Sequence, residues 1–257
     1  MKKLLLVLFL SFMFIVLPSC GGTDDEVKVL TYAEYQACEL DSEVVIESYV
    51  QAKQVWNKDN AQASVYLQDK DGAYFVYGMN CTKDEYDNLK AGTKIRVTGI
   101  KAEWSGEIEI AAGSTFKVVE AEPWIATATD VTAKLGTDGL IKEQNKLVSM
   151  KNLTIVASKY QEKDADGNVT SEEDRPFTFK KYNEDGSGVE GTDLYFNVSD
   201  GKNTYSFTVE SDLCGADTDV YQAIKTLNIG DVVNLEGFCY WYNGINPHIT
   251  KCELVTK

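Results

Sequence analysis

The sequence is poor in the residues that most often carry catalysis, metal binding and nucleic-acid binding. It contains one histidine, His248, and only two arginines, Arg96 and Arg175. A single histidine excludes sites built from several histidines. Lysine and arginine together number 25 against 40 aspartate and glutamate residues, which gives a formal net charge of −15. Phosphate groups need clustered basic side chains, so this balance argues against nucleic acid as a partner.

Several motifs of enzymes are also missing from the sequence. It has no Cys-x-x-Cys pair and no glycine-rich loop of the kind that cradles phosphate, and no pair of carboxylates stands out for acid–base catalysis. We therefore predict no catalytic residue, no cofactor, no metal and no enzyme activity. Hydrophobic residues make up 44% of the 257 residues, which is the composition of a globular chain of one or two domains.

The first nineteen residues have the composition of an export signal. Two lysines precede an uncharged run over residues 4–17, which is shorter than the roughly 20 apolar residues of a membrane-spanning helix. The run ends in Leu17, Pro18, Ser19 and Cys20. This ending resembles the lipobox of bacterial lipoproteins, which have an aliphatic residue three before the cysteine and a small residue just before it. An ordinary secretory signal with an incidental cysteine remains the alternative.

The lipoprotein resemblance implies where this chain is located. Cys20 would carry the acyl chains and become the mature N-terminus, so residues 1–19 would be a signal peptide that is removed. The lipid bilayer would then be a partner through acylated Cys20, because two or three acyl chains anchor a protein stably. Residues 20–30 are small and acidic and predict a flexible tether. We expect an exported protein anchored in the bacterial cell envelope, at the outer membrane or cell surface.

The chain contains an internal repeat. Glycines seven residues apart occur twice, and each trio follows a leucine and has a tryptophan shortly before its last glycine. The two trios are Gly92, Gly99, Gly106 and Gly230, Gly237, Gly244. Each trio lies downstream of an Asp-Gly turn and an apolar run, so we predict two copies of one domain, over residues 31–122 and 123–257.

Both copies have the same predicted order of elements. Apolar residues mostly alternate with polar ones, which predicts strands, and Thr82 with Glu85 forms a capping box that opens a short helix. The order is three strands, a helix and two strands. This order and the glycine spacing resemble the OB-fold, a five-stranded Greek-key barrel with a helix between its third and fourth strands. The predicted fold class is therefore all-β with short helices, as two tandem OB-like barrels.

The resemblance also implies where a ligand would bind. OB-folds commonly bind oligonucleotides or oligosaccharides on the face of strands two and three, between the loops that flank it. Aromatic side chains in these regions could stack on sugars or bases, or could simply fill the barrels. The candidates are Trp56, Tyr66, Tyr74, Tyr77, Trp104, Tyr195, Tyr205, Trp241 and Tyr242.

These features predict a binding module without catalytic activity, whose ligand is a glycan or another envelope protein. Two alternatives stay open at this stage. One is an OB-fold protein that binds single-stranded nucleic acid, and the other is a purely structural or assembly role in the cell envelope.

An acidic segment over residues 162–173 nearly matches an EF-hand calcium loop. Glu162, Asp164, Asp166 and Glu173 fall on ligand positions, and Gly167 falls on the turn position. However, the first ligand is glutamate rather than aspartate, and the flanks have the pattern of strands rather than helices. We therefore favour a hairpin turn between strands, with calcium binding as the alternative.

Five cysteines follow Cys20. An exported chain sits where disulfides persist, so Cys239 with Cys252 and Cys38 with Cys81 are possible pairs. Five is an odd number, so at least one thiol stays free or pairs with another chain. Buried free thiols are the alternative for all of them.

Overall fold

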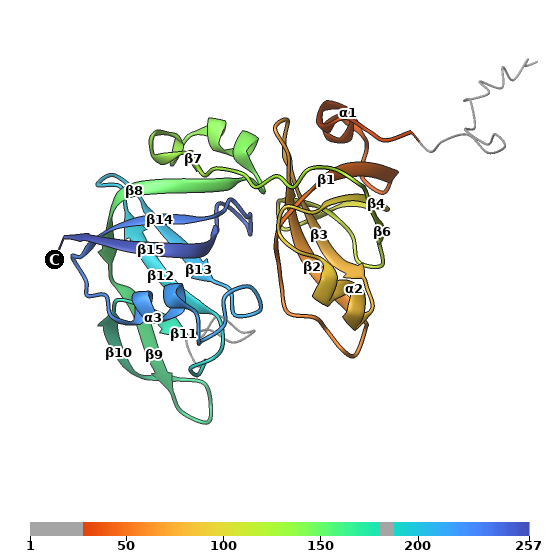
Figure 1. Cartoon of the computed structure of the whole chain (residues 1–257). Helices are drawn as coiled ribbons and strands as arrows, with labels where there is room; N and C mark the ends of the chain where they lie inside the picture. The colour runs from red at the N-terminus through yellow and green to blue at the C-terminus, as the bar shows by residue number, and fades with distance from the viewer. Residues whose placement is uncertain (1–27, 180–187, 257) are drawn as a thin grey trace, which may run out of the picture.

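The computed structural model describes residues 28–179 and 188–256 and contains two β-barrels in tandem (Figure 1). Cys20 and the predicted signal peptide lie outside the described residues. The first sheet spans residues 43–118 and the second spans residues 129–256, so one connecting segment joins the barrels.

The first barrel is closed by five strands. They are β1 (Glu43–Lys53), β2 (Gln62–Gln68), β3 (Ala73–Asn80), β4 (Lys94–Trp104) and β5 (Glu107–Ile110). Their order is β1-β2-β3-β5-β4, and pairing between β1 and β4 closes the sheet. All neighbours are antiparallel except β3 and β5, which run parallel. A further strand, β6 (Thr115–Val118), pairs with β4.

The second barrel repeats this topology strand for strand. Its strands are β8 (Leu147–Val156), β12 (Leu194–Ser199), β13 (Thr204–Val209), β14 (Val232–Phe238) and β15 (His248–Thr256). They follow the order β8-β12-β13-β15-β14, with closure between β14 and β8 and a parallel pair of β13 and β15. Short β7 (Thr129–Asp130) pairs with β8, and β11 (Thr178–Phe179) pairs with β12.

Short helices complete both barrels. Helix α2 (Lys83–Asn88) lies between β3 and β4, and α3 (Asp219–Lys225) lies between β13 and β14. The capping box that opens α2 is present, because the Thr82 hydroxyl accepts from the Glu85 amide while the Glu85 carboxylate accepts from the Thr82 amide. Helix α1 (Tyr32–Ala37) precedes the first barrel, and 3₁₀ helices η1 (Thr132–Lys134) and η2 (Asp138–Glu143) precede the second. The prediction of two OB-like barrels is confirmed.

The repeated glycines occupy matching places in the two barrels. The amide of Gly92 donates to the carbonyl of Val50 at 2.7 Å, and the amide of Gly230 donates to the carbonyl of Ile155 at 2.9 Å. Each bond joins the start of the fourth strand to the first strand. Gly106 and Gly244 both sit in the turn between strands four and five with positive φ angles of 91° and 137°. The internal repeat is therefore a structural repeat.

The middle glycine of each trio lies where the sheet leaves no room for a side chain. A Cβ on Gly99 would lie 2.6 Å from the Ile110 side chain, and a Cβ on Gly237 would lie 2.3 Å from the His248 carbonyl oxygen. Both glycines are on the fourth strand opposite the fifth. The fifth strand approaches so closely that only glycine fits at this bend.

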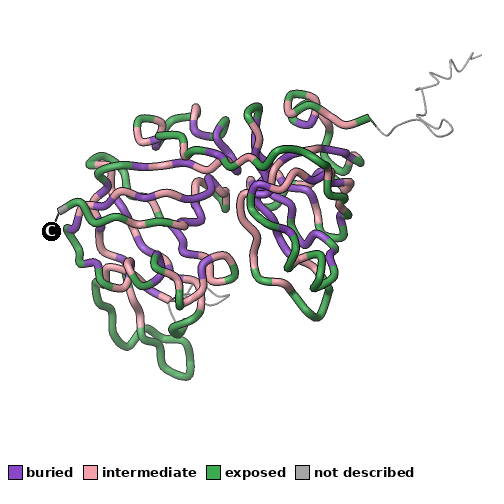
Figure 2. The backbone as a smooth tube through the Cα atoms, viewed as in Figure 1, coloured by how far each residue is buried: buried purple, intermediate pink, exposed green. Residues whose placement is uncertain are grey.

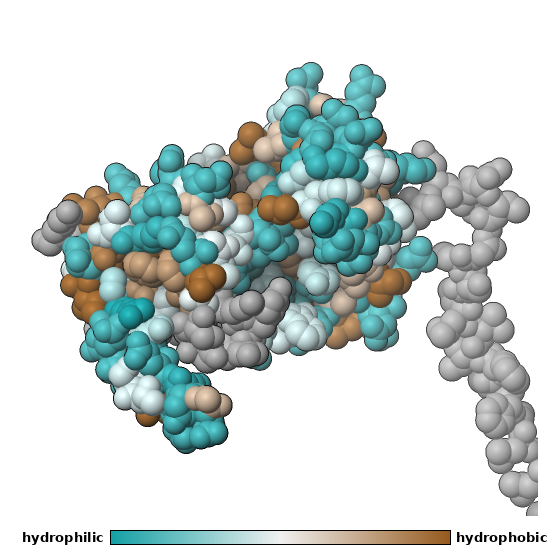
Figure 3. Space-filling model, turned by 90° about the horizontal axis from the view of Figure 1, so that it is seen from below, coloured by the Kyte–Doolittle hydropathy of each residue, from teal (hydrophilic) through white to brown (hydrophobic). Residues whose placement is uncertain are grey.

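Each barrel has its own apolar core. The tube in Figure 2 shows buried residues alternating with less buried ones along the strands, as in β12, where every second residue is buried. Phe196, Phe207 and Met150 are among the largest fully buried side chains of the second barrel, and Ile46, Leu67 and Ile95 are among those of the first. On the outer surface, apolar side chains are scattered among hydrophilic ones on the face that Figure 3 presents.

The acidic segment forms a hairpin, as favoured from its flanks. Strands β9 (Ser158–Lys163) and β10 (Val169–Arg175) pair antiparallel, and the turn between them is held by Asp164. One carboxylate oxygen of Asp164 accepts from the amides of Asp166 and Asn168, each at 2.9 Å. The Glu162 carboxylate accepts from the Ser171 hydroxyl across the hairpin, and that of Glu173 pairs with Arg175. Over the described residues, no cluster of three or more metal-binding side chains is found.

The two suggested disulfides are not formed, and the five cysteines among the described residues are free thiols. Cys252 lies opposite Leu235 in the β14–β15 ladder, whereas Cys239 follows four residues later. At about 3.3 Å per residue, this offset separates the two by roughly 13 Å along the sheet. Cys38 ends α1, which packs on Tyr74 at the start of β3, while Cys81 follows the far end of that strand.

We predict that Gly237→Ala destabilises the protein by about 1–3 kcal/mol, because the added methyl group overlaps the β15 backbone. Gly139→Ala is the matched control, since its Cβ would lie 3.5 Å from the nearest atom and its φ is not positive. Urea unfolding followed by circular dichroism measures both. Equal midpoints for the two variants would contradict the close approach.

Candidate ligand-binding cleft between the barrels

The two barrels dock through aromatic rings. Tyr66 of β2 is fully buried and stacks on Phe238 of β14, with ring centroids 4.1 Å apart. Phe75 of β3 packs edge-on against Tyr240, which follows β14, at 5.3 Å. These rings remove most of their apolar area from water, which is the main favourable contribution to docking. The second barrel therefore covers part of the face of β2 and β3 that OB-folds commonly use for binding.

Polar contacts extend this interface on one side. Glu107 of β5 is fully buried, and one of its carboxylate oxygens accepts from the Trp241 amide at 2.9 Å and from the Gln144 side chain at 3.2 Å. The amide of Asn243 donates to the carbonyl of Ser105 at 2.7 Å. Thus the β4–β5 connection of the first barrel touches the β14–β15 connection of the second.

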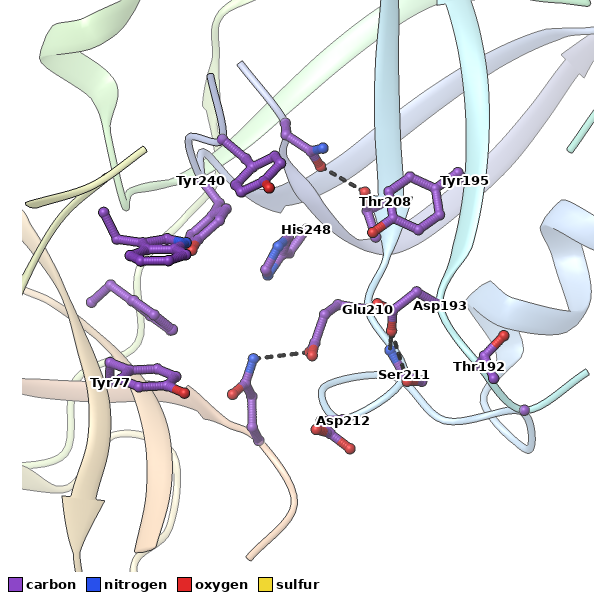
Figure 4. Close-up of a pocket in the computed structure, with 16 residues that line it drawn as sticks. Tyr77, Thr192, Asp193, Tyr195, Thr208, Glu210, Ser211, Asp212, Tyr240 and His248 are labelled. Atoms are coloured by element: carbon purple, nitrogen blue, oxygen red, sulfur yellow. Dashed lines mark hydrogen bonds between the residues drawn. The ribbon is translucent and has the colours of Figure 1, made fainter. Parts of the chain in front are cut away.

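A cleft of about 530 Å³ opens beside this interface and is lined by both barrels (Figure 4). The first barrel contributes Gln54, Phe75, Tyr77 and Trp104. The second contributes residues from the segment before β12, from the end of β13 and from the β14–β15 connection. Its size is within the range of small-molecule sites, and its position between two domains is a common one for such sites.

Exposed aromatic rings form one wall of the cleft. Trp104 is 60% exposed, Tyr77 is 52% exposed and Tyr242 is 41% exposed. Large aromatic side chains usually bury most of their surface, so three exposed rings around one cleft are unusual. Figure 4 shows Tyr77 and Tyr240 on the side of the cleft that faces the carboxylates described next. We call these four residues the aromatic wall.

Carboxylates form the opposite wall. Asp193, Glu210 and Asp212 come from the segment before β12 and from the residues that follow β13. Burial, with the nearby charges of Asp193 and Asp212 as lesser causes, raises the pKa of Glu210 to about 8. The Gln54 side chain reaches across from the first barrel and donates to Glu210 at 2.9 Å. We call Asp193, Glu210 and Asp212 the acidic wall.

The only histidine lies at the base of the cleft. His248 is 8% exposed, and its Nδ1 is 2.8 Å from the hydroxyl of Tyr66. Burial lowers the pKa of His248 to about 3, so the ring is neutral at ordinary pH. Its ring also stacks on Tyr240 at 4.3 Å. Tyr66 from the first barrel and Tyr240 from the second therefore both fix the position of His248.

The structure separates the sequence-predicted aromatic residues into three groups. Tyr77, Trp104, Tyr195 and Tyr242 line the cleft. Tyr66 and Tyr74 are fully buried and present no face to a ligand, Tyr66 against Phe238 and Tyr74 against the rings of α1. The third group lies outside the cleft and consists of Trp56, Tyr205 and Trp241. Trp56 donates to the Cys81 carbonyl, and Tyr205 donates to the Asp200 carboxylate. Trp241 packs on the core of the second barrel.

Sequence reasoning missed the acidic wall, Tyr240, Gln54 and the position of His248. The Glu210-Ser211-Asp212 run directly after β13 is a usable signal, since loops at strand ends often carry binding groups. No sequence pattern brings Gln54 to Glu210, because they are 156 residues apart and belong to different barrels.

The chain matches no known protein-family profile, and no curated protein matches it in sequence. Solved structures of similar fold include a murine DNA-binding protein bound to double-stranded DNA, at 13% identity and a TM-score of 0.38, covering 83% of this chain and 96% of that one. Single-stranded DNA-binding protein from Thermus aquaticus has 13% identity, a TM-score of 0.24 and coverage of 84% and 93%. A replication protein A heterotrimer bound to single-stranded DNA has 10% identity, a TM-score of 0.27 and coverage of 90% and 70%. At these identities the likeness concerns the class of fold.

These comparisons correct one prediction. The net charge of the chain argues against nucleic acid as a partner, yet proteins of similar fold include structures bound to DNA. An acidic total does not by itself exclude such a ligand, because recognition depends on the groups within the site.

We predict that Glu107→Gln makes the protein more stable above pH 8, by roughly 2 kcal/mol or more. Burial raises the pKa of Glu107 from 4.5 to about 8, so folding favours its protonated form. Its contribution is complete below pH 4.5 and is lost as the pH rises through about 8. Glutamine mimics the protonated acid, so the unfolding free energy of the variant should fall less between pH 5 and pH 9.

Chemical unfolding at several pH values tests this expectation, with the exposed Glu103→Gln as control. Burial also raises the pKa of Glu109 to about 7, so some pH dependence should remain in the Glu107 variant. Identical pH profiles for the wild type and Glu107→Gln would show that Glu107 is ionised in the folded protein.

Proposed function

We propose that this chain is an exported, lipid-anchored binding module without catalytic activity, and that its ligand occupies the cleft between the barrels. The observation that carries the proposal is the wall of exposed rings facing carboxylates across a 530 Å³ cleft. Rings offer flat apolar faces, while carboxylates and amides offer hydrogen bonds, so together they fit a ligand that is flat on one side and polar at its edge.

A glycan is the ligand that this chemistry supports best. The faces of sugar rings are apolar and could stack on Trp104, Tyr77 or Tyr242. Their hydroxyl groups both donate and accept hydrogen bonds, as the acidic wall, Gln54 and the neutral His248 require. An extracellular or envelope location would also bring the cleft into contact with glycans. A segment of another envelope protein is a variant of the same proposal.

Single-stranded nucleic acid is the second candidate. What supports it is the fold, because OB barrels commonly bind oligonucleotides through stacked aromatic side chains. The exposed rings would then hold bases, with the phosphates directed toward solvent. Binding that weakens steeply with rising salt would identify this ligand class, because neutralised phosphates release counterions.

The lipid anchor rests on the residues around Cys20. The uncharged run of residues 4–17 supports export, and the lipobox-like ending supports acylation of Cys20. We propose that the acylated protein is located at the outer membrane or cell surface. Within the described ranges, no helix is long and apolar enough to cross a membrane.

We expect Trp104→Ala, Tyr77→Ala and Tyr242→Ala each to weaken ligand binding about tenfold, the effect of losing roughly 1.4 kcal/mol of stacking. Binding to a panel of immobilised glycans and single-stranded oligonucleotides, followed by titration of any hit at two salt concentrations, provides the measurement. Tyr160→Ala, on the β9–β10 hairpin outside the cleft, should bind like the wild type. Unchanged binding by all three cleft variants would place the ligand elsewhere.

A separate prediction concerns the anchor. Cys20→Ser should abolish incorporation of a radiolabelled or clickable fatty acid, because no thiol remains at the acylation position. The variant protein should move from the membrane fraction to the soluble fraction of the cells. Cys252→Ser, which changes a cysteine within the second barrel, should keep both label and location. Fatty-acid labelling that persists in Cys20→Ser would refute the lipobox interpretation.

A further inference from the structure

The described side chains that line the cleft include acidic groups but no basic ones other than a histidine. Among the described residues that line it are three carboxylates and no lysine or arginine. His248 adds no positive charge, because burial lowers its pKa to about 3. Carboxylates held close together repel one another, so this lining favours either a bound cation or protonation of one carboxyl group.

Hydrogen bonds from neighbouring residues hold two carboxylates of the acidic wall, those of Asp193 and Glu210, in position. One oxygen of Asp193 accepts from the amide and the hydroxyl of Ser211, at 2.8 and 2.7 Å. One oxygen of Glu210 accepts from Gln54 at 2.9 Å. The second oxygen of Asp193 has no hydrogen-bond partner within the described part of the chain, and the Glu210 carboxylate also accepts from the backbone of Leu213. Groups fixed in this way lose little freedom when they bind, which favours affinity.

His248 provides an independent sign that a ligand belongs here. Its side chain is more than nine-tenths buried and lines the cleft, and Nδ1 is occupied by Tyr66. The Tyr66 hydroxyl has no other hydrogen-bond partner in the described ranges. We therefore assign the hydroxyl as the donor to Nδ1 and place the proton of the neutral ring on Nε2. Nε2 itself has no partner among these residues. A donor is therefore available in the cleft for a ligand hydroxyl.

We propose that the cleft selects a saccharide that carries a protonated amine. The sugar ring lies on the aromatic wall, the ammonium group bonds to the carboxylates of Glu210 and Asp193, and a ring hydroxyl accepts from His248. An ammonium group supplies three donors and a positive charge, which matches the acidic wall, and it is also attracted to the faces of nearby aromatic rings. The inference rests on the proposed function and narrows it to one class of sugar.

Binding of such a ligand should also release a proton. Burial and the neighbouring aspartates raise the pKa of Glu210 to about 8, so this group is largely protonated at neutral pH. A bound ammonium group favours the ionised carboxylate, and the proton leaves to the buffer. A neutral sugar in the same position would leave this proton in place.

The test compares two probes that share one sugar backbone and differ at the nitrogen, which is a basic amine in one and a neutral acetamide in the other. One is the β-1,4-linked tetramer of glucosamine, and the other is the same tetramer with every amine acetylated. Isothermal titration of the full chain at pH 5.5, where both the amines of the probe and Glu210 are protonated, should give at least tenfold tighter binding of the glucosamine tetramer. The heat of binding should vary with the ionisation enthalpy of the buffer, as proton release requires. Equal or tighter binding of the acetylated tetramer would overturn the inference.

Variants locate the effect at the acidic wall. Glu210→Gln and Asp193→Asn keep the size of each side chain and should each weaken the glucosamine tetramer about tenfold. Glu210→Gln should also remove the buffer dependence of the heat. Glu253→Gln, an exposed carboxylate outside the cleft, is the matched control and should bind like the wild type. Full binding by both acidic-wall variants would overturn the inference.

The remaining outcomes separate this inference from the proposed function. If both tetramers bind equally and Trp104→Ala weakens both, the cleft is a glycan site without selection for amines. If only an oligonucleotide binds and Trp104→Ala weakens it, the cleft is a binding site of another class, and the amine inference is wrong. If no probe binds at all, the amine inference fails together with the glycan proposal.

Discussion

The contact between Tyr66 and Phe238 is the interaction on which the rest of the arrangement depends. It joins β2 of the first barrel to β14 of the second and buries both rings completely or nearly so. Because the Tyr66 hydroxyl also meets His248, the orientation of the docked barrels is constrained by a directional bond as well as by apolar area. The cleft exists only in this orientation, since residues of both barrels line it.

Docking also changes what the OB-fold face can do. The second barrel covers part of the outer face of β2 and β3 of the first barrel, so Tyr66 and Phe75 are interface residues. Binding groups are displaced to the margin of that face, where Tyr77 and Trp104 remain exposed. Both barrels supply aromatic rings to the site, whereas its three carboxylates all come from the second barrel, although both barrels have the same topology.

Local patterns in the sequence were sufficient for the fold. The glycine trios, the alternation of apolar residues and the capping box at Thr82 are short-range features, and short-range physics decides strands, bends and helix starts. The candidate site could be predicted only in part, because Tyr66 and Tyr77 carry the same aromatic signal and only the neighbouring barrel decides which one is covered. Cys239 and Cys252 show a similar limit, since the strand pair was predictable but the register that separates the two thiols was not.

The shared skeleton and the unequal chemistry of the two barrels have an evolutionary consequence. A duplicated domain begins with two identical halves, so the confinement of the acidic wall to the second barrel must have arisen afterwards, while the glycine positions were retained. From that point neither half could substitute for the other. Recombination that replaced one barrel with a second copy of the other would preserve two folded barrels but would remove the cleft lining of the replaced barrel.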